Sequence, residues 1–396
     1  MYSTQTSAEA ITAGRSWPPA LRLVFRLAFV YIALYLLPQW LFLILRSLSW
    51  IPGIFGIANA YAAGWQWIEL WVGRNVLAIS TPIDVHTLGT GSGDTLLNYL
   101  ELLCQSALAV VAAVIWTALD AKRTTYDTLH QWLRVYVRYA LCGILLSYGT
   151  AKVFFPGQFA HPTLDRLIEP FGHSSPMGLL WTFMGYSRAY TFFTGAVECA
   201  GGLLLLSQRT TMLGALVVAA AMGNVAVLNF SYDVPVKLYS TQLFLLAVFL
   251  LIPEIPRFVR VFVTNQPAEA APFRKPFTTV WRHRAALAAK WIVIAGMLWQ
   301  NFGSRAAASR QPPRPRSPRY GIYEVDSFVA NGVPRPAAPM DARRWRRVIV
   351  SENGGVSVQT MDDATIRYRT KDDPAKQTFE LSTIFSPYDK TVLTYR

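Results

Sequence analysis

Ionisable side chains inside long apolar stretches are the residues of this sequence that could do chemistry. Tyr148 and Lys152 are four residues apart near the end of one apolar stretch, so they share one face of a predicted helix. Glu198 lies near the middle of the next apolar stretch. Charge inside a membrane helix is costly, which makes such groups functional candidates by default. A lysine, a phenol and a carboxylate at similar depth could hydrogen-bond a carbonyl group and exchange protons with it. Lys152, Glu198 and Tyr148 are therefore our candidate catalytic residues.

Other polar residues are predicted at the same middle or outer depth, and they are candidate substrate-binding residues. One group follows a spacing of four, three and four residues from Asp94 to Gln105, which places it on one face of a helix. The same residues also fit a structural interpretation, a network of buried ion pairs that fixes the register of the helices, and the sequence leaves both open. The candidate substrate-binding residues are Asn224, Asp233, Lys237, Asp94, Asn98, Glu101 and His161.

The sequence contains no motif for a resident redox cofactor. Its three cysteines, Cys104, Cys142 and Cys199, all fall in apolar stretches and have neither metal-ligand nor haem-attachment spacing. His161 and His173 lie 12 residues apart without a nearby cysteine, so we predict no metal site. Proton transfer at a cavity mouth is the more plausible chemistry for these two histidines. Any electrons would come from a partner or from a substrate thiol.

The elements that must position these residues are membrane helices. Of the 396 residues, 53% are hydrophobic and only 15% are charged, whereas soluble domains have about 25% charged residues. This composition excludes a disordered chain and an ordinary cytosolic enzyme. A bilayer core needs about 20 apolar residues per helix. We therefore predict an α-helical integral membrane bundle of about seven spans, at Leu23–Leu45, Thr95–Leu119, Val135–Phe155, Ala189–Leu206, Thr210–Asn229, Val236–Ile252 and Leu287–Phe302.

Two further stretches are predicted to lie at the membrane without crossing it. Ile51–Ile79 is rich in tryptophan, which is typical of an interfacial helix. Pro176–Gly185 is too short to span and is predicted to be a re-entrant half-helix that lines a cavity. Lys and Arg concentrate in alternate connections between the spans. This pattern predicts a multi-pass protein of a bacterial-type cytoplasmic (inner) membrane, with a cytoplasmic N-terminus and an extracytoplasmic C-terminal domain.

The chain divides by composition into a membrane domain (1–302), a basic Pro/Arg linker (303–319) and a β domain (320–396). In the β domain, alternation with a period of two predicts a small antiparallel sheet or partial barrel. An open meander leaves an unpaired edge, at which a protein partner is expected. Lysines and arginines are spread over loops and the linker, so the lipid bilayer, and not a nucleic acid, is the expected partner. The predicted strands are Ile322–Val329, Arg346–Ser351, Val356–Thr360, Ile366–Thr370, Thr378–Ser382 and Thr391–Tyr395.

Part of the membrane domain resembles a known family. Arg138 and the motif Gly149-x2-Lys152 fall in one predicted helix, and the next helix contains the glycine-rich stretch Gly195–Leu205 around Glu198. Over residues 138–252 this pattern resembles the four-helix core of the DoxX-like membrane family. The resemblance implies redox chemistry linked to quinones or thiols, with a quinone as the cofactor. The chain has a more distant likeness to the membrane domain of vitamin K-dependent carboxylases, which implies a lysine base at Lys152 or Lys237.

Three functions fit these features. The first is a quinone- or thiol-linked redox subunit with a polar cavity in its outer half; if the protein is an enzyme, it is then a membrane oxidoreductase component. The second is a non-enzymatic membrane scaffold or assembly factor whose β domain binds a partner. The third is a transporter of a small solute, although the sequence contains no inverted repeat of the transporter kind.

Overall fold

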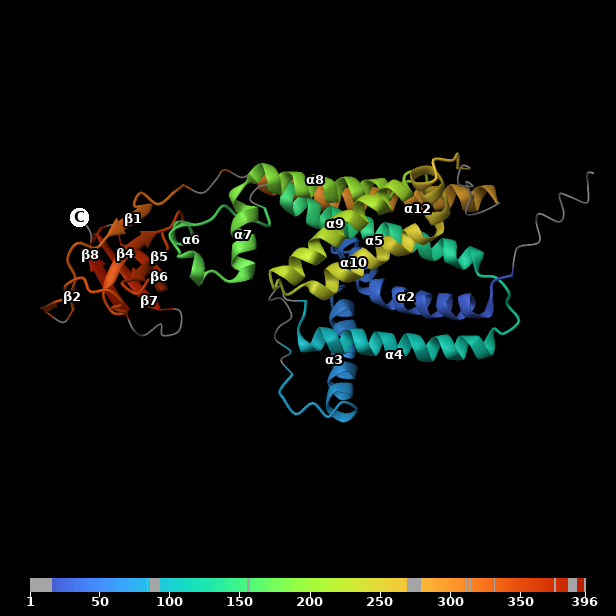
Figure 1. Cartoon of the computed structure of the whole chain (residues 1–396), viewed down its shortest axis with the longest axis horizontal. Coiled ribbons are helices and arrows are strands. Elements are labelled where there is room, and N and C mark those ends of the chain that lie inside the picture. Colours follow the sequence, from blue (N-terminus) through green and yellow to red (C-terminus); the bar gives the residue numbers. More distant parts are fainter. Residues whose placement is uncertain are drawn as a thin grey trace, which may run out of the picture. The chain divides into compact units, whose positions relative to one another are not determined.

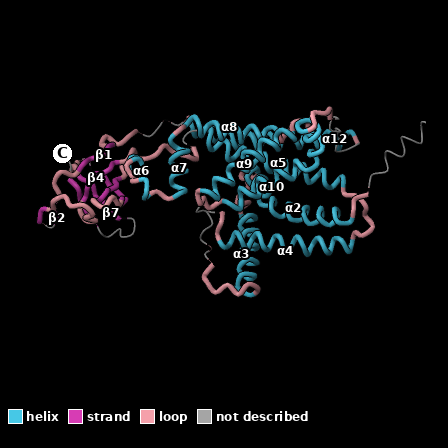
Figure 2. The backbone as a smooth tube through the Cα atoms, viewed as in Figure 1, coloured by secondary structure: helices cyan, strands magenta, loops and turns pink. Residues whose placement is uncertain are grey.

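The computed structural model describes residues 16–83, 85, 93–154, 157–268, 279–310, 312, 315–330, 332–373, 375–383 and 390–394. It forms two compact units, each built from two separate stretches of the chain. The helical unit comprises Met1–Val153 and Phe193–Arg305, and the sheet unit comprises Phe154–Phe192 and Ala306–Arg396. Figure 2 shows that the described strands all belong to the C-terminal part of the chain.

The helical unit contains a helix at each of the seven predicted span positions. These helices are α2 (Pro19–Ser47), α4 (Leu96–Leu119), α5 (Asp127–Val153), α8 (Arg188–Leu204), α9 (Thr211–Ser231), α10 (Lys237–Leu251) and α12 (Val280–Leu298). Helix α10 continues through η2 (Ile252–Glu254), α11 (Ile255–Phe258) and η3 (Val259–Val263), and α12 continues through the π-helix η4 (Trp299–Gly303) and α13 (Ser304–Ser309).

Four of these helices are long and apolar enough to cross a membrane: α2, α4, α9 and the continuous stretch Lys237–Val263. This supports the prediction of a helical membrane protein. The count of seven spans is not confirmed, and the other three helices show why. Helix α8 has 17 residues, fewer than the roughly 20 that a span needs. Helices α5 and α12 contain several charged residues each.

The predicted interfacial segment contains α3 (Gly56–Asn75). Figure 1 shows that α3 runs crosswise to α2 and α4, and α3 packs against α4. Trp67 and Trp71 are exposed on its surface. Exposed tryptophans are typical of a helix at a membrane surface, and the interfacial position of α3 stays a prediction.

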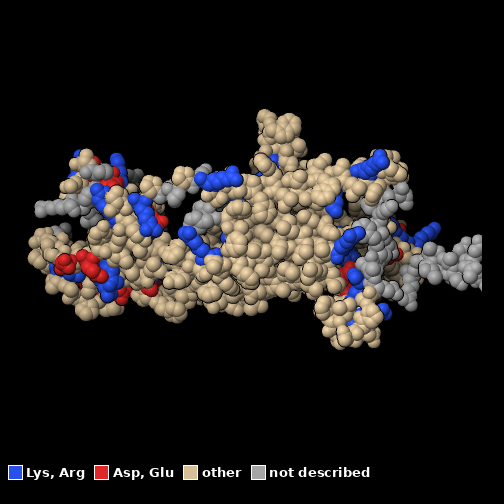
Figure 3. Space-filling model, turned by 90° about the horizontal axis from the view of Figure 1, so that it is seen from above, with Lys and Arg blue, Asp and Glu red and all other residues tan. Residues whose placement is uncertain are grey.

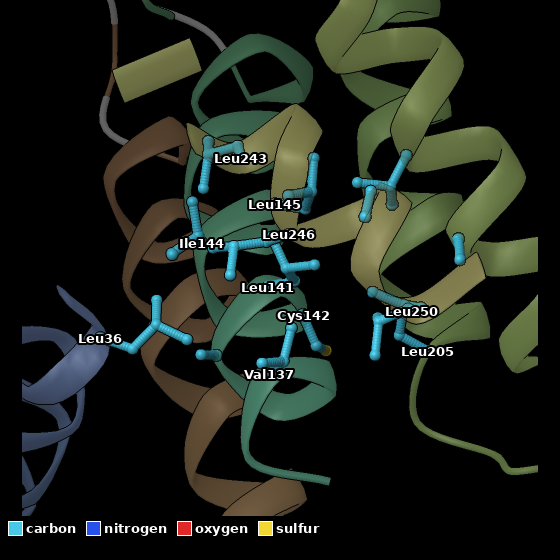
Figure 4. Close-up of a cluster of buried hydrophobic side chains, with 14 of the residues drawn as sticks. Leu36, Val137, Leu141, Cys142, Ile144, Leu145, Leu205, Leu243, Leu246 and Leu250 are labelled. Carbon is cyan, nitrogen blue, oxygen red and sulfur yellow. The ribbon is translucent and has the colours of Figure 1, made fainter. Parts of the chain in front are cut away.

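Helix α5 forms the centre of the hydrophobic core of the helical unit. With the exception of the partly buried Tyr139, its side chains from Val137 to Leu146 are almost completely buried, among them Leu141 and Leu145 (Figure 4). They pack against Leu36 of α2 and Leu246 of α10. By contrast, α2, α4 and α12 leave many large apolar side chains exposed. The face of this unit that Figure 3 shows has a broad band without Lys, Arg, Asp or Glu, as expected for a surface in contact with lipid.

The sheet unit contains the antiparallel meander that the sequence predicts. Its order is β1-β4-β5-β6-β7-β8, and Val350, Val356, Phe379 and Leu381 form its core. Among the described residues the sheet is open, with β1 and β8 at its edges, and so does not close as a barrel. The strands of this sheet are β1 (Gly321–Glu324), β4 (Trp345–Val350), β5 (Val356–Thr360), β6 (Thr365–Asp373), β7 (Thr378–Thr383) and β8 (Lys390–Thr394).

The first predicted strand, Ile322–Val329, is not continuous. Strand β1 ends at Glu324, and β2 (Val329–Ala330) pairs instead with β3 (Val333–Pro334) in a separate ribbon. Gly332 between them has φ of +80°, a conformation that glycine adopts without strain. The turn at Gly332 therefore closes a small hairpin that is separate from the six-stranded sheet.

The segment between α5 and α8 belongs to the sheet unit. It contains α6 (Leu164–Leu167), η1 (Phe171–His173) and α7 (Pro176–Tyr186), and α6 contacts β4. The sequence-based division treats this segment as part of the membrane domain and begins the β domain at residue 320. The helix predicted at Pro176–Gly185 does form, as α7, within the same compact unit as the sheet.

Candidate functional site

Two glycines bring α5 and α8 into backbone contact. A Cβ atom added to Gly149 would lie 2.7 Å from the Gly195 carbonyl oxygen, and one added to Gly195 would lie 2.6 Å from the Gly149 carbonyl oxygen. Gly202, two turns further along α8, faces Leu145 and Cys142, which lie one and two turns before Gly149 on α5; a Cβ atom there would lie 3.2 Å from Leu145 Cβ and 3.3 Å from the Cys142 carbonyl oxygen. Small residues at a helix interface allow this close approach. The glycine-rich stretch of α8 thus forms a packing surface for α5.

The close contact places Lys152 of α5 against Glu198 of α8. The Lys152 Nζ and Glu198 Oε1 atoms form an ion pair, and the two side chains are only 8% and 3% exposed. The second carboxylate oxygen, Glu198 Oε2, is buried and has no hydrogen-bond partner in the described part of the chain. A buried carboxylate oxygen without a partner calls for an explanation, because leaving it unsatisfied costs about 1–3 kcal/mol or more. It is available to a proton or to a donor from a ligand.

Tyr148, the third catalytic candidate, lies at the edge of this pair. Its side chain is 42% exposed, and its ring contacts that of Tyr239 with 6.0 Å between centroids. The phenol interacts electrostatically with Glu198, so the two groups share one neighbourhood. The structure therefore brings all three predicted catalytic residues together. The Tyr148 side chain is partly exposed, and those of Lys152 and Glu198 are buried.

Asp94, Asp233 and Lys237 form a separate cluster at the start of α10. The Lys237 and Leu238 backbone N–H groups donate to the Asp94 carboxylate at 2.7 and 2.9 Å, so Asp94 caps the helix. Lys237 Nζ pairs with Asp233 Oδ1 at 2.7 Å and lies 3.9 Å from Asp94. No hydrogen bond or ion pair of the described residues joins this cluster to Lys152 or Glu198. Its contacts have the geometry of a helix cap, which corresponds to the structural interpretation.

The polar side chains of α4 also form hydrogen bonds within their own helix. Asn98 forms a capping box with Thr95, and the Gln105 amide donates to Glu101 Oε1 at 3.0 Å. Asn224 is exposed on α9. The buried amide of that helix is instead Asn229, whose Nδ2 donates to Ser240 Oγ at 3.0 Å. Asn229 is the last residue of a predicted span, where a polar amide is common. The sequence-based candidates therefore do not include it.

Arg138, the first residue of the family resemblance, has a structural contact. Its guanidinium is buried and donates two hydrogen bonds to the Leu205 carbonyl oxygen, at 2.9 Å from Nε and 2.8 Å from Nη2. Leu205 directly follows the last residue of α8. A cation that binds the terminal carbonyl of a helix stabilises that helix end. Arg138 thus attaches the end of α8 to α5.

Glu69 is a buried carboxylate that the sequence-based candidates omit. It lies on α3, is 4% exposed, and interacts electrostatically with Glu101 of α4. It is the single acidic residue between the tryptophans of that segment, which is the signal that could have identified it. Across the described residues, no group of three or more His, Cys, Asp or Glu side chains is arranged to hold a metal ion.

His161 lies in the sheet unit, not in the unit that contains Lys152. It is exposed, its ring stacks on Tyr186, and its Nδ1 atom lies 3.1 Å from the Pro162 carbonyl oxygen. The buried polar contact of this segment is made by Asp165, whose Oδ2 accepts hydrogen bonds from Arg367 Nε at 3.1 Å and Nη2 at 2.8 Å. This ion pair joins α6 to strand β6.

We expect the Asp165–Arg367 ion pair to make the sheet unit less stable in acid. Burial raises the pKa of the Asp165 carboxyl, but hydrogen bonds from Thr163 and Arg367 outweigh it and hold the pKa below its usual value. The stabilisation is therefore complete above the pKa of about 3.9 in the unfolded chain and is lost as the pH falls through the lower folded-state pKa. We expect amide hydrogen exchange in α6 and β6, corrected for intrinsic rates, to accelerate below pH 4.

The Asp165→Asn variant separates this effect from general acid unfolding. It should exchange faster than the wild type at pH 6 and show a smaller further acceleration in acid. Glu352→Gln is the matched control, because its pair with Arg316 is largely exposed and contributes little. Identical exchange profiles of wild type and Asp165→Asn at pH 6 would show that the pair does not hold the two segments together.

Comparison with known proteins gives one relative of unknown function. The chain is 35% identical over 115 residues to "Uncharacterized protein YwoB" of Bacillus subtilis (strain 168), a match that covers 29% of this chain and 72% of that protein. No family model matches the chain, and no solved structure matches it. Because the match covers more than two thirds of the relative, the chain belongs to the same family as YwoB.

Proposed function

We propose that the protein is a DoxX-like membrane protein that binds an isoprenoid quinone beside Lys152 and Glu198 and reduces it with electrons from thiols. The observation that supports this most strongly is the buried Glu198 Oε2 atom without a partner. A purely structural ion pair needs one contact between the two side chains, and that contact is made by Oε1. The second oxygen remains available to accept and release a proton.

The proposed reaction balances without a resident cofactor. Two thiols form one disulfide and release two electrons and two protons, and the quinone takes up both to become the quinol. Lys152 would donate a hydrogen bond to one quinone oxygen, Glu198 would transfer protons to it, and Tyr148 would face the entering ring. The half-exposed position of Tyr148 at the rim of the pair fits lateral entry from the lipid. The proposal places the protein in a bacterial-type inner membrane with its N-terminus in the cytoplasm.

The test is the quinone content of the purified full chain. Solvent extraction and chromatography should recover a stoichiometric quinone from the wild type and much less from Glu198→Gln and Tyr148→Phe. Glu101→Gln is the matched control, because Glu101 is a carboxylate on α4 that bonds its own helix neighbour Gln105. If the wild type binds no quinone, and membranes of a Lys152→Ala/Glu198→Ala strain reduce quinone at the wild-type rate, the proposal is wrong.

A second candidate function, a membrane scaffold, has its own supporting observation. Strand β8 is an edge of the sheet, and Val392 on it is 61% exposed. An unpaired edge strand can accept a strand from a partner. Affinity purification from solubilised membranes should then recover a stoichiometric protein that is lost on deletion of residues 320–396 and weakened by Val392→Lys. If the wild type, the deletion variant and Val392→Lys all recover the same proteins, this function is excluded.

A further inference from the structure

A cavity of about 60 Å³ lies between α2, α5 and the π-helix η4. A single water needs only about 10–15 Å³ of such space, so the cavity has room for a group of several heavy atoms. Gly143 of α5 leaves this space open, because a Cβ atom there would lie 3.3 Å from the Met297 Cε atom. A π-helix in an otherwise α-helical segment occurs frequently at functional sites, and Gln300 and Asn301 of η4 line this cavity.

The cavity lies on the opposite side of α5 from the Lys152–Glu198 pair. Ala140, Gly143 and Ser147, which line it, follow a spacing of three and four and so share one helix face. Gly149 and Lys152, which contact α8, fall on the other side of α5 at 100° per residue. The cavity is thus a different site from the one proposed for the quinone.

The lining of the cavity is rich in hydrogen-bond donors. Arg46 contributes a guanidinium, and Gln39, Gln300 and Asn301 contribute amides, each with two N–H bonds. One N–H of Gln300 donates to Ser47 Oγ at 3.4 Å, and one N–H of Asn301 donates to the Met297 carbonyl oxygen at 2.8 Å. The indole Nε1–H of Trp40 is buried and has no acceptor among the described residues, although its ring is fixed against Tyr136 at 5.4 Å between centroids.

No aspartate or glutamate occurs among the described lining residues, so the cavity has a cation and donors without an acidic counterpart. Arg305, just beyond η4, donates a hydrogen bond to the Ser147 carbonyl oxygen at 3.4 Å and adds a second positive charge at the same end of α5. A buried donor without an acceptor, next to uncompensated positive charge, is complementary to an anionic oxygen.

We infer that this cavity binds a phosphate group, with its oxygens on Arg46, the lining amides and the Trp40 N–H. The phosphate of a phospholipid and free inorganic phosphate share this chemistry. The position of the cavity favours the lipid. It lies at the C-terminal ends of α2 and α12, beside apolar side chains such as Phe42 and Trp299, which are exposed and can contact acyl chains.

The test uses the full chain in detergent, titrated with phosphatidylglycerol and observed by native mass spectrometry. One lipid should bind to the wild type more tightly than a diacylglycerol with the same acyl chains. Arg46→Gln should weaken binding by about tenfold or more, since it removes a charge-assisted bond. Trp40→Phe, which keeps a ring on Tyr136 and removes only the N–H, should weaken binding by about threefold to tenfold. Gly143→Val should abolish binding by filling the cavity.

Matched controls keep the result independent of folding and of general charge. Arg282→Gln removes one cation from the opposite end of α12, and Trp291→Phe alters an exposed tryptophan of α12 outside the cavity lining. Both variants should bind the lipid like the wild type. Competition with inorganic phosphate identifies the source: displacement of the lipid indicates a free-phosphate site, and its retention indicates a headgroup site. Equal retention of diacylglycerol, or wild-type binding by Arg46→Gln and Trp40→Phe, would refute the inference.

Discussion

Replacing Lys152 by methionine is expected to destabilise the helical unit by about 3–5 kcal/mol, the usual cost of removing one partner of a buried ion pair. The Glu198 carboxylate would then be buried with both oxygens unpartnered, because Lys152 is its only hydrogen-bond partner among the described residues. The double variant Lys152→Met/Glu198→Leu should recover most of this loss, since two apolar side chains of similar size can replace a buried pair at little net cost. Thermal unfolding in detergent, as a double-mutant cycle, measures both quantities.

The control for this cycle is Arg316→Met at the exposed pair with Glu352, where a change of less than about 1 kcal/mol is expected. The cycle also separates structure from function. A double variant that recovers stability but contains no quinone supports a chemical role for the pair. If Lys152→Met is as stable as the wild type, the pair is not a buried ion pair, and both interpretations of it fail.

The second large effect is expected at Gly149. A Cβ atom there would lie 2.6 Å from Cys199 Sγ and 2.9 Å from the Cys199 backbone nitrogen, so Gly149→Ala requires the backbones of α5 and α8 to separate. Overpacking of this kind costs about 1–3 kcal/mol, and the cost is at the upper end when the obstructing atoms belong to the backbone. Gly195→Ala should have a similar effect, since it meets the Gly149 carbonyl oxygen.

Gly296→Ala on α12 is the matched control, because no atom lies within 4 Å of its added Cβ. Alanine also favours a helix over glycine, so this control should be neutral or slightly stabilising. The separation of α5 and α8 has a second consequence: it should weaken the Lys152–Glu198 pair. Measured thermal stability of Gly149→Ala equal to that of Gly296→Ala would contradict the backbone contact.

The helices and strands were predictable because hydrophobic patterns are local. Apolar runs located the seven helices at the predicted span positions, and alternation located most strands of the sheet. The Lys152–Glu198 contact was also predictable, because successive predicted spans tend to pack side by side and the sequence places both residues at similar depth. Lys237 shows the limit of that reasoning. Depth alone does not specify which way a helix face points, and its partner Asp94 lies 143 residues away in the sequence.

The sequence also could not predict which segments make up the sheet unit, because the contacts that join them link residues far apart in the sequence. Nothing in the sequence around Asp165 indicates that its partner is Arg367, 202 residues later, because the carboxylate looks like an ordinary polar residue of a connecting loop. The segments 154–192 and 306–396 each have their own local pattern, and only the tertiary contacts combine them. Long-range ion pairs and helix caps leave no periodic signal, whereas amphipathic elements do.

The assembly of the sheet unit from two distant stretches has a consequence for biosynthesis. Asp165 is made first, and its partner Arg367 follows 202 residues later; at about 5–20 residues per second the ribosome needs about 10–40 s to reach it. During that interval the segment containing α6 and α7 has no sheet to pack against, and the Asp165 carboxylate, which is buried in the finished unit, has no cation to bind. The segment is then open to chaperones and proteases. A nascent chain that stalls before β6 therefore leaves this segment without its folding partner, even though the segment itself was completed much earlier.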